Sequence, residues 1–207
     1  HNQLDLCESC LELLKRIENA CPTCALPLST TGSGKRCGRC LKSGSYLDRA
    51  IAPFVYAPPL TDIIQSMKYQ RQISAARLLG GLLAPYVDTS HIDLIVPVPL
   101  HWRSLQQRGF NQATEIARVV SRRHHSPFDI NLLTKKRHTE RQSLLNAKER
   151  ASNLKKVFKV NNASLDGKRI AVVDDVMTTG ATLNETARLL KANGAAHVEG
   201  WAVSRAI

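Results

Sequence analysis

Residues 170–182 read Ile-Ala-Val-Val-Asp-Asp-Val-Met-Thr-Thr-Gly-Ala-Thr, an apolar run followed by two carboxylates and a threonine-rich turn. A helical pattern begins near Ala181. This order predicts a buried strand, a polar loop at its carboxyl end and the amino terminus of a helix. Ligands of open α/β sheets bind at that edge. Because the first helical turn has free N–H groups and a positive dipole end, such a loop suits an anion.

The residue types of this loop indicate a sugar phosphate. Hydroxyl donors come from Thr178, Thr179 and Thr182. Gly180 lets the backbone approach a phosphate without an intervening Cβ. Asp174 and Asp175 would repel a phosphate, but they suit sugar hydroxyls or a hydrated Mg²⁺ beside it. A structural turn is the alternative, since many helices begin with Thr. Two acids and three threonines around one glycine favour the phosphate site.

Composition bounds the class of protein. The chain has 207 residues, of which 43% are hydrophobic, enough for one α/β domain and a small appendage. No apolar run approaches the ~18 residues of a membrane span. A net charge of +12 favours anionic partners such as nucleic acid or phosphorylated metabolites. Aromatic residues make up only 5%, so we do not expect a broad platform for stacking bases.

All six cysteines lie in the first 40 residues, in three Cys-x-x-Cys pairs. Regular pairs in a phosphate-binding chain without a recognisable secretory signal indicate zinc, with disulfides or a redox role as the alternative. Two pairs complete a tetrahedral site. The best-spaced ribbon uses Cys21, Cys24, Cys37 and Cys40.

The remaining pair, Cys7 and Cys10, has no partner pair in the chain. Either these two cysteines are spare, or their partners preceded His1. Since the chain opens without a methionine, we expect a missing amino-terminal piece and include both among the candidate metal ligands. Spacing also leaves open a site built from Cys7 and Cys10 with Cys21 and Cys24.

The chain divides into two predicted parts. Residues 1–45 indicate a metal-stabilised module too small to fold around its own core, and residues 46–207 indicate an α/β domain. Apolar patterns predict strands at 50–56, 92–98, 130–133, 168–173 and 198–204, and helices from 60 onward and at 73–87, 111–123 and 183–193. Their alternation predicts a parallel, doubly wound sheet.

Two further segments concentrate donors near the predicted edge. Val96-Pro97-Val98-Pro99 closes a strand, and Arg108-Gly109-Phe110-Asn111-Gln112 follows it. Asn111 suits a simple helix cap. The functional interpretation, which we favour, has Arg108 and backbone N–H groups, including that of Gly109, grip a pyrophosphate. Lys68 ends an apolar helix and fits a surface lysine, with the pyrophosphate site as its alternative.

Residues 135–156 carry eight basic side chains against two glutamates. A solvated segment is one interpretation. A mobile loop that closes over a reaction centre, or a contact with nucleic acid, is equally favoured. The candidates for contact with single-stranded DNA are Lys135, Lys136, Arg137 and Arg141.

Several motifs occur together in one order: the cysteine pairs, Tyr56-Ala57-Pro58-Pro59-Leu60, the two loops above, Gln142-x-x-Leu145, Asn153-Leu154 and the acidic-threonine loop. In this the chain resembles the ComF (GntX-like) family, which has an amino-terminal double zinc ribbon and a type I phosphoribosyltransferase domain. Members commonly begin with four cysteine pairs, whereas this chain has three. The resemblance implies that Asp174 and Asp175 hold the ribose hydroxyls of phosphoribosyl pyrophosphate (PRPP). It also implies that Thr178, Thr179, Gly180, Ala181 and Thr182 cradle the 5′-phosphate.

The family resemblance further implies a role in natural transformation or the use of extracellular DNA, on the cytoplasmic side of uptake. Expected partners are single-stranded DNA, a competence helicase and a DNA-loading protein; expected cofactors are structural zinc and Mg²⁺ with PRPP. Two hypotheses follow. In one, the protein is a phosphoribosyltransferase that uses Asp174, Asp175 and Arg108 on an unidentified acceptor. In the other, it is a non-catalytic nucleic-acid adaptor whose PRPP pocket senses a phosphate or nucleotide.

Overall fold

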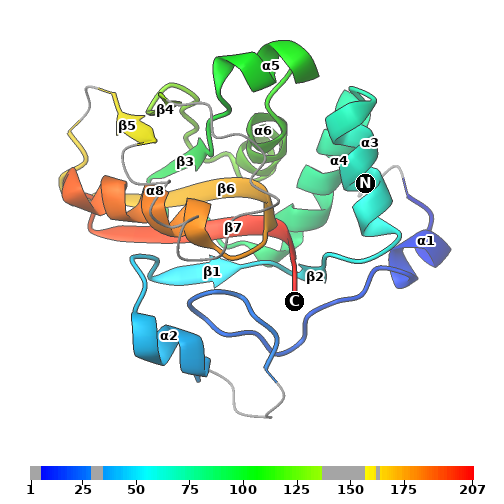
Figure 1. The fold of residues 1–207 in the computed structure, drawn as a ribbon, viewed down its shortest axis with the longest axis horizontal. Helices are drawn as coiled ribbons and strands as arrows, with labels where there is room; N and C mark the ends of the chain where they lie inside the picture. The colour runs from blue at the N-terminus through cyan, green and yellow to red at the C-terminus, as the bar shows by residue number, and fades with distance from the viewer. Residues whose placement is uncertain (1–5, 29–34, 137–156, 162–163) are drawn as a thin grey trace.

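The computed structural model describes residues 6–28, 35–136, 157–161 and 164–207 (Figure 1). Within these ranges, the centre is a five-stranded sheet in the order β1-β7-β6-β3, in which β2 also pairs with β7. All of its pairings are parallel. Its strands are β1 (Arg49–Ile51), β2 (Phe54–Val55), β3 (Leu94–Pro97), β6 (Arg169–Met177) and β7 (His197–Arg205). The predicted parallel sheet is confirmed.

The two long central strands, β6 and β7, have mainly apolar side chains on both faces. In β6, Ala171 and Val173 contribute to one hydrophobic core, while Ile170 and Val172 contribute to the other. Such continuous apolar runs are typical of parallel strands covered by helices on both sides. The sheet is therefore sandwiched between two cores.

Helices cover both faces of this sheet. One core contains residues of α3 (Leu60–Tyr69), α4 (Ile73–Leu83), the 3₁₀ turn η1 (Ala84–Tyr86) and α6 (Gln112–His124), and the other contains α8 (Ala181–Ala192). Figure 1 shows α8 and the α4–α6 pair in separate places around the central strands. A Cβ on Gly80 of α4 would lie 2.6 Å from the Cβ of Val119, so glycine allows these two helices to approach closely.

Three predicted elements need correction at their ends, and one helix was missed. The strand predicted at 50–56 is interrupted at Pro53, which has no N–H for the ladder. The helix predicted at 73–87 ends at Leu83 and tightens into η1, which holds Pro85. β6 continues past Val173 to Met177, so the acidic pair lies in the strand rather than after it. A short helix, α5 (Trp102–Arg108), was not predicted.

The strand predicted at 130–133 was also misplaced. The observed strand, β4 (Leu133–Lys135), pairs antiparallel with β5 (Phe158–Val160) in a separate two-stranded sheet. Ile130 is 48% exposed, whereas Leu133 and Phe158 are buried beside α8. The short apolar run indicated a strand, but it held no information about the partner.

The amino-terminal segment packs along the edge of the domain. It contains α1 (Glu8–Glu12) and α2 (Gly38–Ser43). Ile17 N–H donates to the Pro53 carbonyl at 2.8 Å, and Val55 N–H donates to the Lys15 carbonyl at 2.8 Å. Leu14 is buried in the same core as α3 and α4. The predicted boundary at residue 45 stays a prediction. Among the described helices, none is long and apolar enough to cross a membrane.

Candidate functional site

The threonine-rich turn joins β6 to α8 at the carboxyl end of the sheet. Gly180 caps α8 in the left-handed conformation, with φ of 79°, which glycine adopts without strain. Ala181 N–H donates to Thr179 Oγ1 at 3.3 Å. The helical ladder starts only where Asn184 N–H reaches the Gly180 carbonyl at 2.9 Å. The earlier N–H groups lie outside this ladder, as an anion site at a helix amino terminus requires.

A small hollow of about 20 Å³ opens at this turn. Its lining combines the turn with one residue of the acidic pair: Asp174, Val176, Met177, Thr178, Gly180, Ala181, Thr182 and Leu183. The structure therefore brings Asp174 and the predicted phosphate residues to one place. Thr179 lies in the same turn, where its hydroxyl accepts from the Ala181 N–H.

The two adjacent carboxylates differ in their surroundings. Asp175 is 8% exposed and its Oδ2 lies 2.6 Å from Lys68 Nζ. Asp174 Oδ1 accepts the Asp175 N–H at 2.8 Å. Loss of hydration and, next, the charge of Asp175 raise the pKa of Asp174 to about 7. Because a nearby cation would relieve this repulsion, the pair favours a cationic or hydrogen-bond-donating ligand.

Lys68 of α3 pairs directly with Asp175, and Arg108 of α5 and Lys135 of β4 add positive charge to the same region. Although burial opposes it, the charges of Asp175 and Asp174 raise the pKa of Lys68. Burial lowers the pKa of Lys135, while the charge of Asp174 acts to raise it and that of Arg108 to lower it. Positive charge from distant parts of the sequence thus meets two carboxylates at one sheet edge.

The loop after β3 holds Arg108 in place. Asn111 caps α6 by accepting the Ala113 N–H at 3.1 Å, and its Nδ2 donates to the Val98 carbonyl at 3.0 Å. The predicted helix cap is confirmed. Arg108 Nη1 donates to Gln112 Oε1 at 3.1 Å, while the buried Nε2 of Gln112 has no partner among the described residues. Gly109 ends α5 with φ of 83°. The cap and the anion-binding interpretation are therefore compatible.

Four cysteines form a buried cluster beneath the sheet edge. Their Sγ atoms all lie within 4.8 Å of one another, and the Sγ atoms of Cys24 and Cys37 are 3.6 Å apart. A tetrahedral zinc with bonds of about 2.3 Å places its sulfurs about 3.8 Å apart, so the spacing fits. The cluster consists of Cys21, Cys24, Cys37 and Cys40, which are the four ribbon cysteines predicted from spacing.

The thiols of this cluster do not ionise alike. Burial acts to raise the pKa of Cys21, but N–H donors, first that of Cys37, lower it to about 7. Burial raises the pKa of Cys24 and of Cys40. Four sulfurs held this close ionise together only when a cation sits among them. The donor set therefore fits a structural metal ion.

Arg205 joins the cysteine cluster to the threonine-rich turn. This side chain is 1% exposed at the end of β7. Its Nε donates to the Cys24 carbonyl at 2.9 Å, and its Nη1 donates to the carbonyls of Met177, at 2.9 Å, and Thr178. Sequence reasoning missed this residue. The available signal was a charged side chain at the end of a largely apolar strand.

The other predicted ligands lie apart from these groups. Cys7 precedes α1 and Cys10 lies within it; both are exposed and outside the four-cysteine cluster, so their metal role stays a prediction. Lys136 is exposed next to β4. Arg137 and Arg141 lie outside the described residues. Lys135, predicted for nucleic acid, is half-buried and its charge interacts with that of Asp174; its contact with DNA stays a prediction.

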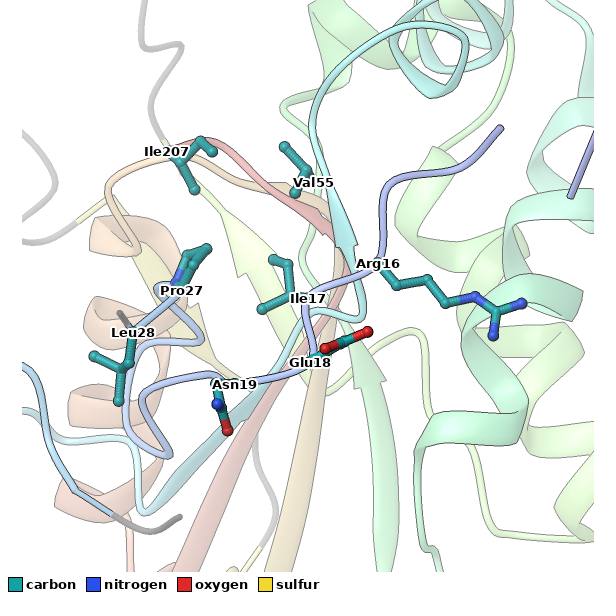
Figure 2. A pocket seen from close by; sticks show the side chains of 8 residues that line it. All are labelled: Arg16, Ile17, Glu18, Asn19, Pro27, Leu28, Val55 and Ile207. Carbon is teal, nitrogen blue, oxygen red and sulfur yellow. The ribbon is translucent and has the colours of Figure 1, made fainter. Parts of the chain in front are cut away.

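A larger hollow, of about 330 Å³, lies away from the acidic pair, where the amino-terminal segment meets the end of the chain. Figure 2 shows aliphatic side chains around it and Arg16 directed away from Pro27 and Ile207. Its lining is Arg16, Ile17, Glu18, Asn19, Pro27, Leu28, Val55 and Ile207. Because no set of polar groups converges there, size alone does not make this hollow the functional site.

Comparison with known proteins agrees with this geometry. The phosphoribosyl transferase domain family matches residues 71–203. DNA utilization protein YhgH of Escherichia coli is 36% identical over 98% of this chain and 91% of its own length. Competence protein F of Haemophilus influenzae is 35% identical over 97% and 90%. Competence protein ComFC of Bacillus subtilis is 28% identical over 97% and 84%.

The family match includes the strand, turn and helix that build the phosphate-type loop, and the relatives align along nearly the whole chain. The fold is therefore that of a type I phosphoribosyltransferase, with four clustered cysteines near its amino terminus. The chain belongs to the ComF family of phosphoribosyl transferase domain proteins.

Proposed function

We propose that this protein binds PRPP with Mg²⁺ at the carboxyl edge of its sheet and acts in the cytoplasm in the uptake or use of DNA. The observation that carries the proposal is convergence at one edge: two adjacent carboxylates, three cations from α3, α5 and β4, and a hydroxyl-rich helix start. PRPP combines two anionic ends with a sugar between them, which is the pattern that this edge complements.

Each part of PRPP has matching groups. The 5′-phosphate takes the N–H and hydroxyl donors of residues 178–182, and Gly180 leaves room for it. The ribose hydroxyls donate to Asp174 and Asp175. The pyrophosphate points toward Lys68 and Arg108, with the Gly109 N–H nearby in sequence and Lys135 as a third cation. Mg²⁺ fits beside the acidic pair, since carboxylate oxygens are its preferred protein ligands.

In the catalytic form of this proposal, a nucleophile bonds to ribose C1 as the C1–O bond to pyrophosphate breaks. The electron pair of that bond leaves with the pyrophosphate. Lys68 and Arg108 stabilise the negative charge that grows on the leaving oxygens, while Asp174 and Asp175 hold the sugar in line. The carboxylates also favour the positive charge that develops on the ribose ring. Mg²⁺ supplies further neutralisation of the phosphates.

The cysteine cluster is proposed to hold one structural zinc ion. The spacing and the burial of the four sulfur atoms support this assignment. Zinc would stiffen the loops that Arg205 ties to the phosphate turn. Metal analysis of the purified chain should give at least one zinc per molecule, and a value near zero in freshly reduced, zinc-supplemented protein would contradict the proposal.

Three observations support the DNA role: the names of the relatives, the net charge of +12 and the basic stretch that begins at Lys135. We propose single-stranded DNA as a partner, held through phosphates by Lys135, Lys136, Arg137 and Arg141. A competence helicase and a DNA-loading protein are the proposed protein partners by family resemblance. A non-catalytic adaptor is the second candidate function, favoured by the same charge.

Calorimetry with PRPP, with and without Mg²⁺, tests the binding proposal, and pyrophosphate release with a panel of bases and amines tests turnover. Binding with release establishes a transferase. Binding without release on every acceptor supports the adaptor that senses PRPP. Absence of binding overturns the site assignment. Thr179→Val should weaken PRPP binding because a hydroxyl is lost from the phosphate turn, whereas the exposed Thr134→Val on β4 should not.

A further inference from the structure

A second group of metal-ligand side chains lies at the opposite edge of the sheet, where the parallel strands begin. His197 and Glu199 belong to the first residues of β7, and His91 lies in the turn before β3. The acidic pair, by contrast, is near the carboxyl end of β6. The three side chains are therefore separate from the proposed PRPP site and from the cysteine cluster.

Their ligand atoms converge on one point. His91 Nε2 lies 2.9 Å and His197 Nε2 lies 3.2 Å from the same oxygen, Glu199 Oε1. All three ligand atoms are within 4.8 Å of one another. A tetrahedral zinc with bonds of about 2.0–2.1 Å to nitrogen and oxygen places its ligands about 3.3 Å apart. The two nitrogen–oxygen distances are within a few tenths of an ångström of this value.

The surroundings of the three side chains also match those of metal ligands. Glu199 is 1% exposed, and its other oxygen, Oε2, accepts the Trp201 Nε1–H at 2.8 Å. His91 Nδ1 lies 3.6 Å from Asp88 Oδ2, and His197 Nδ1 lies 3.7 Å from Asp48 Oδ2. Ligating histidines commonly direct their second nitrogen toward a carboxylate, which orients the ring.

The two rings share a single acceptor. Without a metal ion, His91 and His197 each need a proton on Nε2 to donate to Glu199 Oε1. One divalent ion bound by the two Nε2 atoms and Oε1 would replace these two protons. The ring protons would then lie on the Nδ1 atoms, on the sides that face Asp88 and Asp48.

We propose that His91, His197 and Glu199 form a three-ligand site for a divalent transition metal of the zinc class. Two imidazole nitrogens and one carboxylate oxygen select such ions over Mg²⁺ or Ca²⁺. The side chains of His91 and His197 are 27% and 24% exposed, so an ion enters from solvent and keeps a fourth position for water. Bound metal would fasten the turn that holds His91 to the start of β7.

Trp201 gives a local readout, since its indole N–H is bonded to the proposed ligand Glu199. The other tryptophan, Trp102, is 56% exposed on α5, and Trp102→Phe leaves Trp201 as the single reporter. The 207-residue chain with this change, given one equivalent of zinc to fill the cysteine cluster, would be titrated with Ni²⁺, which quenches nearby indole fluorescence. We expect saturable quenching at one equivalent and its reversal by added Zn²⁺.

Glu199→Gln distinguishes a metal site from a hydrogen-bonded clip, meaning a set of hydrogen bonds from His91 and His197 to Glu199 without a metal ion. The amide oxygen can still accept from Trp201, and the amide NH₂ can donate to a neutral imidazole, so a clip survives but a charged ligand is lost. We expect the affinity for Ni²⁺ to fall at least tenfold in Glu199→Gln and in His197→Gln. His125→Asn is the matched control, because it removes an exposed histidine at a left-handed position that asparagine tolerates.

Unchanged Ni²⁺ affinity in the folded variants would overturn the proposal and leave a purely hydrogen-bonded clip. If Glu199→Gln melts early, His91→Gln decides, since that side chain is partly exposed. A second measurement is independent of tryptophan. Cobalt at the cysteine cluster gives a sulfur-to-metal charge-transfer band, whereas the proposed site adds one Co²⁺ equivalent without increasing that band. Failure to find this additional equivalent in the parent protein also overturns the assignment.

Discussion

Asp174 on β6 is half-buried and Glu199 on the adjacent strand β7 is buried, and their pKa values move in opposite directions. Burial and then the charge of Asp175 raise the pKa of Asp174 to about 7. Burial also acts to raise the pKa of Glu199, but hydrogen bonds from His91, Trp201 and His197 outweigh it and lower the value. Partners, rather than depth, therefore decide the charge of a carboxyl group here. At the carboxyl end of the sheet (the carboxyl edge), Asp174 and Asp175 repel each other, and a ligand would relieve this repulsion. At the amino end of the sheet (the amino edge), the charge of Glu199 is already stabilised by its hydrogen-bond donors.

The largest expected effect concerns Glu199 at the amino edge. Glu199→Ala leaves the Trp201 N–H and two histidines without their common partner, so the free energy of unfolding should fall by about 3 kcal/mol. Urea unfolding measures it. Glu12→Ala, at an exposed position on α1, should change stability by less than about 0.5 kcal/mol. An equally small decrease in the free energy of unfolding of Glu199→Ala would show that the Glu199 carboxylate does not stabilise the amino edge.

The next effect concerns ligand binding at the carboxyl edge, where Asp174 and Asp175 repel each other. Changing both Asp174 and Asp175 to Asn removes two charges at constant shape. PRPP affinity in Mg²⁺ should fall at least tenfold, or ~1.4 kcal/mol. Calorimetry of the folded variant tests this. Glu199→Gln is the contrast, because it alters a carboxylate at the other edge and should leave PRPP affinity unchanged. Equal losses in both variants would erase the difference between the two edges.

The opposite pKa shifts predict opposite effects of pH on stability. Native Asp174 keeps its proton up to about pH 7, whereas an unfolded aspartate releases it near pH 3.8. Native protein binds more protons between these values, so this group makes the free energy of unfolding decrease as pH rises from about 4 to 7. Glu199, with a lowered pKa, stabilises the fold above the unfolded value of 4.5 and loses that contribution in acid.

Unfolding in urea at pH 5 and pH 8 should therefore show a smaller decrease for Asp174→Asn than for the parent protein. Asp62→Asn on the exposed side of α3 is the control and should keep the parent difference. A parent-like difference in Asp174→Asn would mean that other groups set the pH dependence. Glu199→Gln should chiefly reduce the loss of stability below pH 5.

The smallest expected effect concerns DNA binding, and it tests which lysines near the carboxyl edge contact DNA and which contact PRPP. Lys136→Ala should reduce the log–log salt dependence of single-strand binding by about 0.7, the value for one phosphate contact, and leave PRPP binding intact. Lys135→Ala should weaken both, because Lys135 also neighbours Asp174. Lys168, exposed beside the amino edge, provides the control. The measurement is fluorescence anisotropy of labelled single-stranded DNA over a salt series. Equal salt dependence in Lys135→Ala, Lys136→Ala and Lys168→Ala would contradict the assignment.

The carboxyl edge was largely predictable because its chemistry is contiguous in the chain. Residues 170–182 hold the strand, the acids, the hydroxyls and the helix start in one run, and the observed start of α8 at Ala181 matches the prediction. The end of β6 was predicted too early. Two aspartates favour a loop on their own, but pairing with β7 continues through Asp174↔Ala202 to Met177↔Arg205, so tertiary pairing overrides local preference.

The amino edge could not be predicted because its residues have no fixed spacing. His91 and His197 lie on separate segments, and only the parallel pairing of the strands brings them to one carboxylate. The same holds for Lys135. Its sequence neighbours made it one of a row of basic residues, whereas its position in β4 places it by Asp174. A local run of charged residues predicts the charge of a segment, but it does not predict the face of a strand on which each residue lies.

Arg205 has a consequence for how this family can vary. A single guanidinium holds carbonyls that are 181 residues away at Cys24 and 28 away at Met177. Lysine has the charge but lacks the planar fork, so it could not reach both segments at once. A saturation-mutagenesis survey should therefore find this position as intolerant as a cysteine ligand. Exchange of amino-terminal modules between relatives should succeed only where the incoming loop offers a carbonyl to the same arginine.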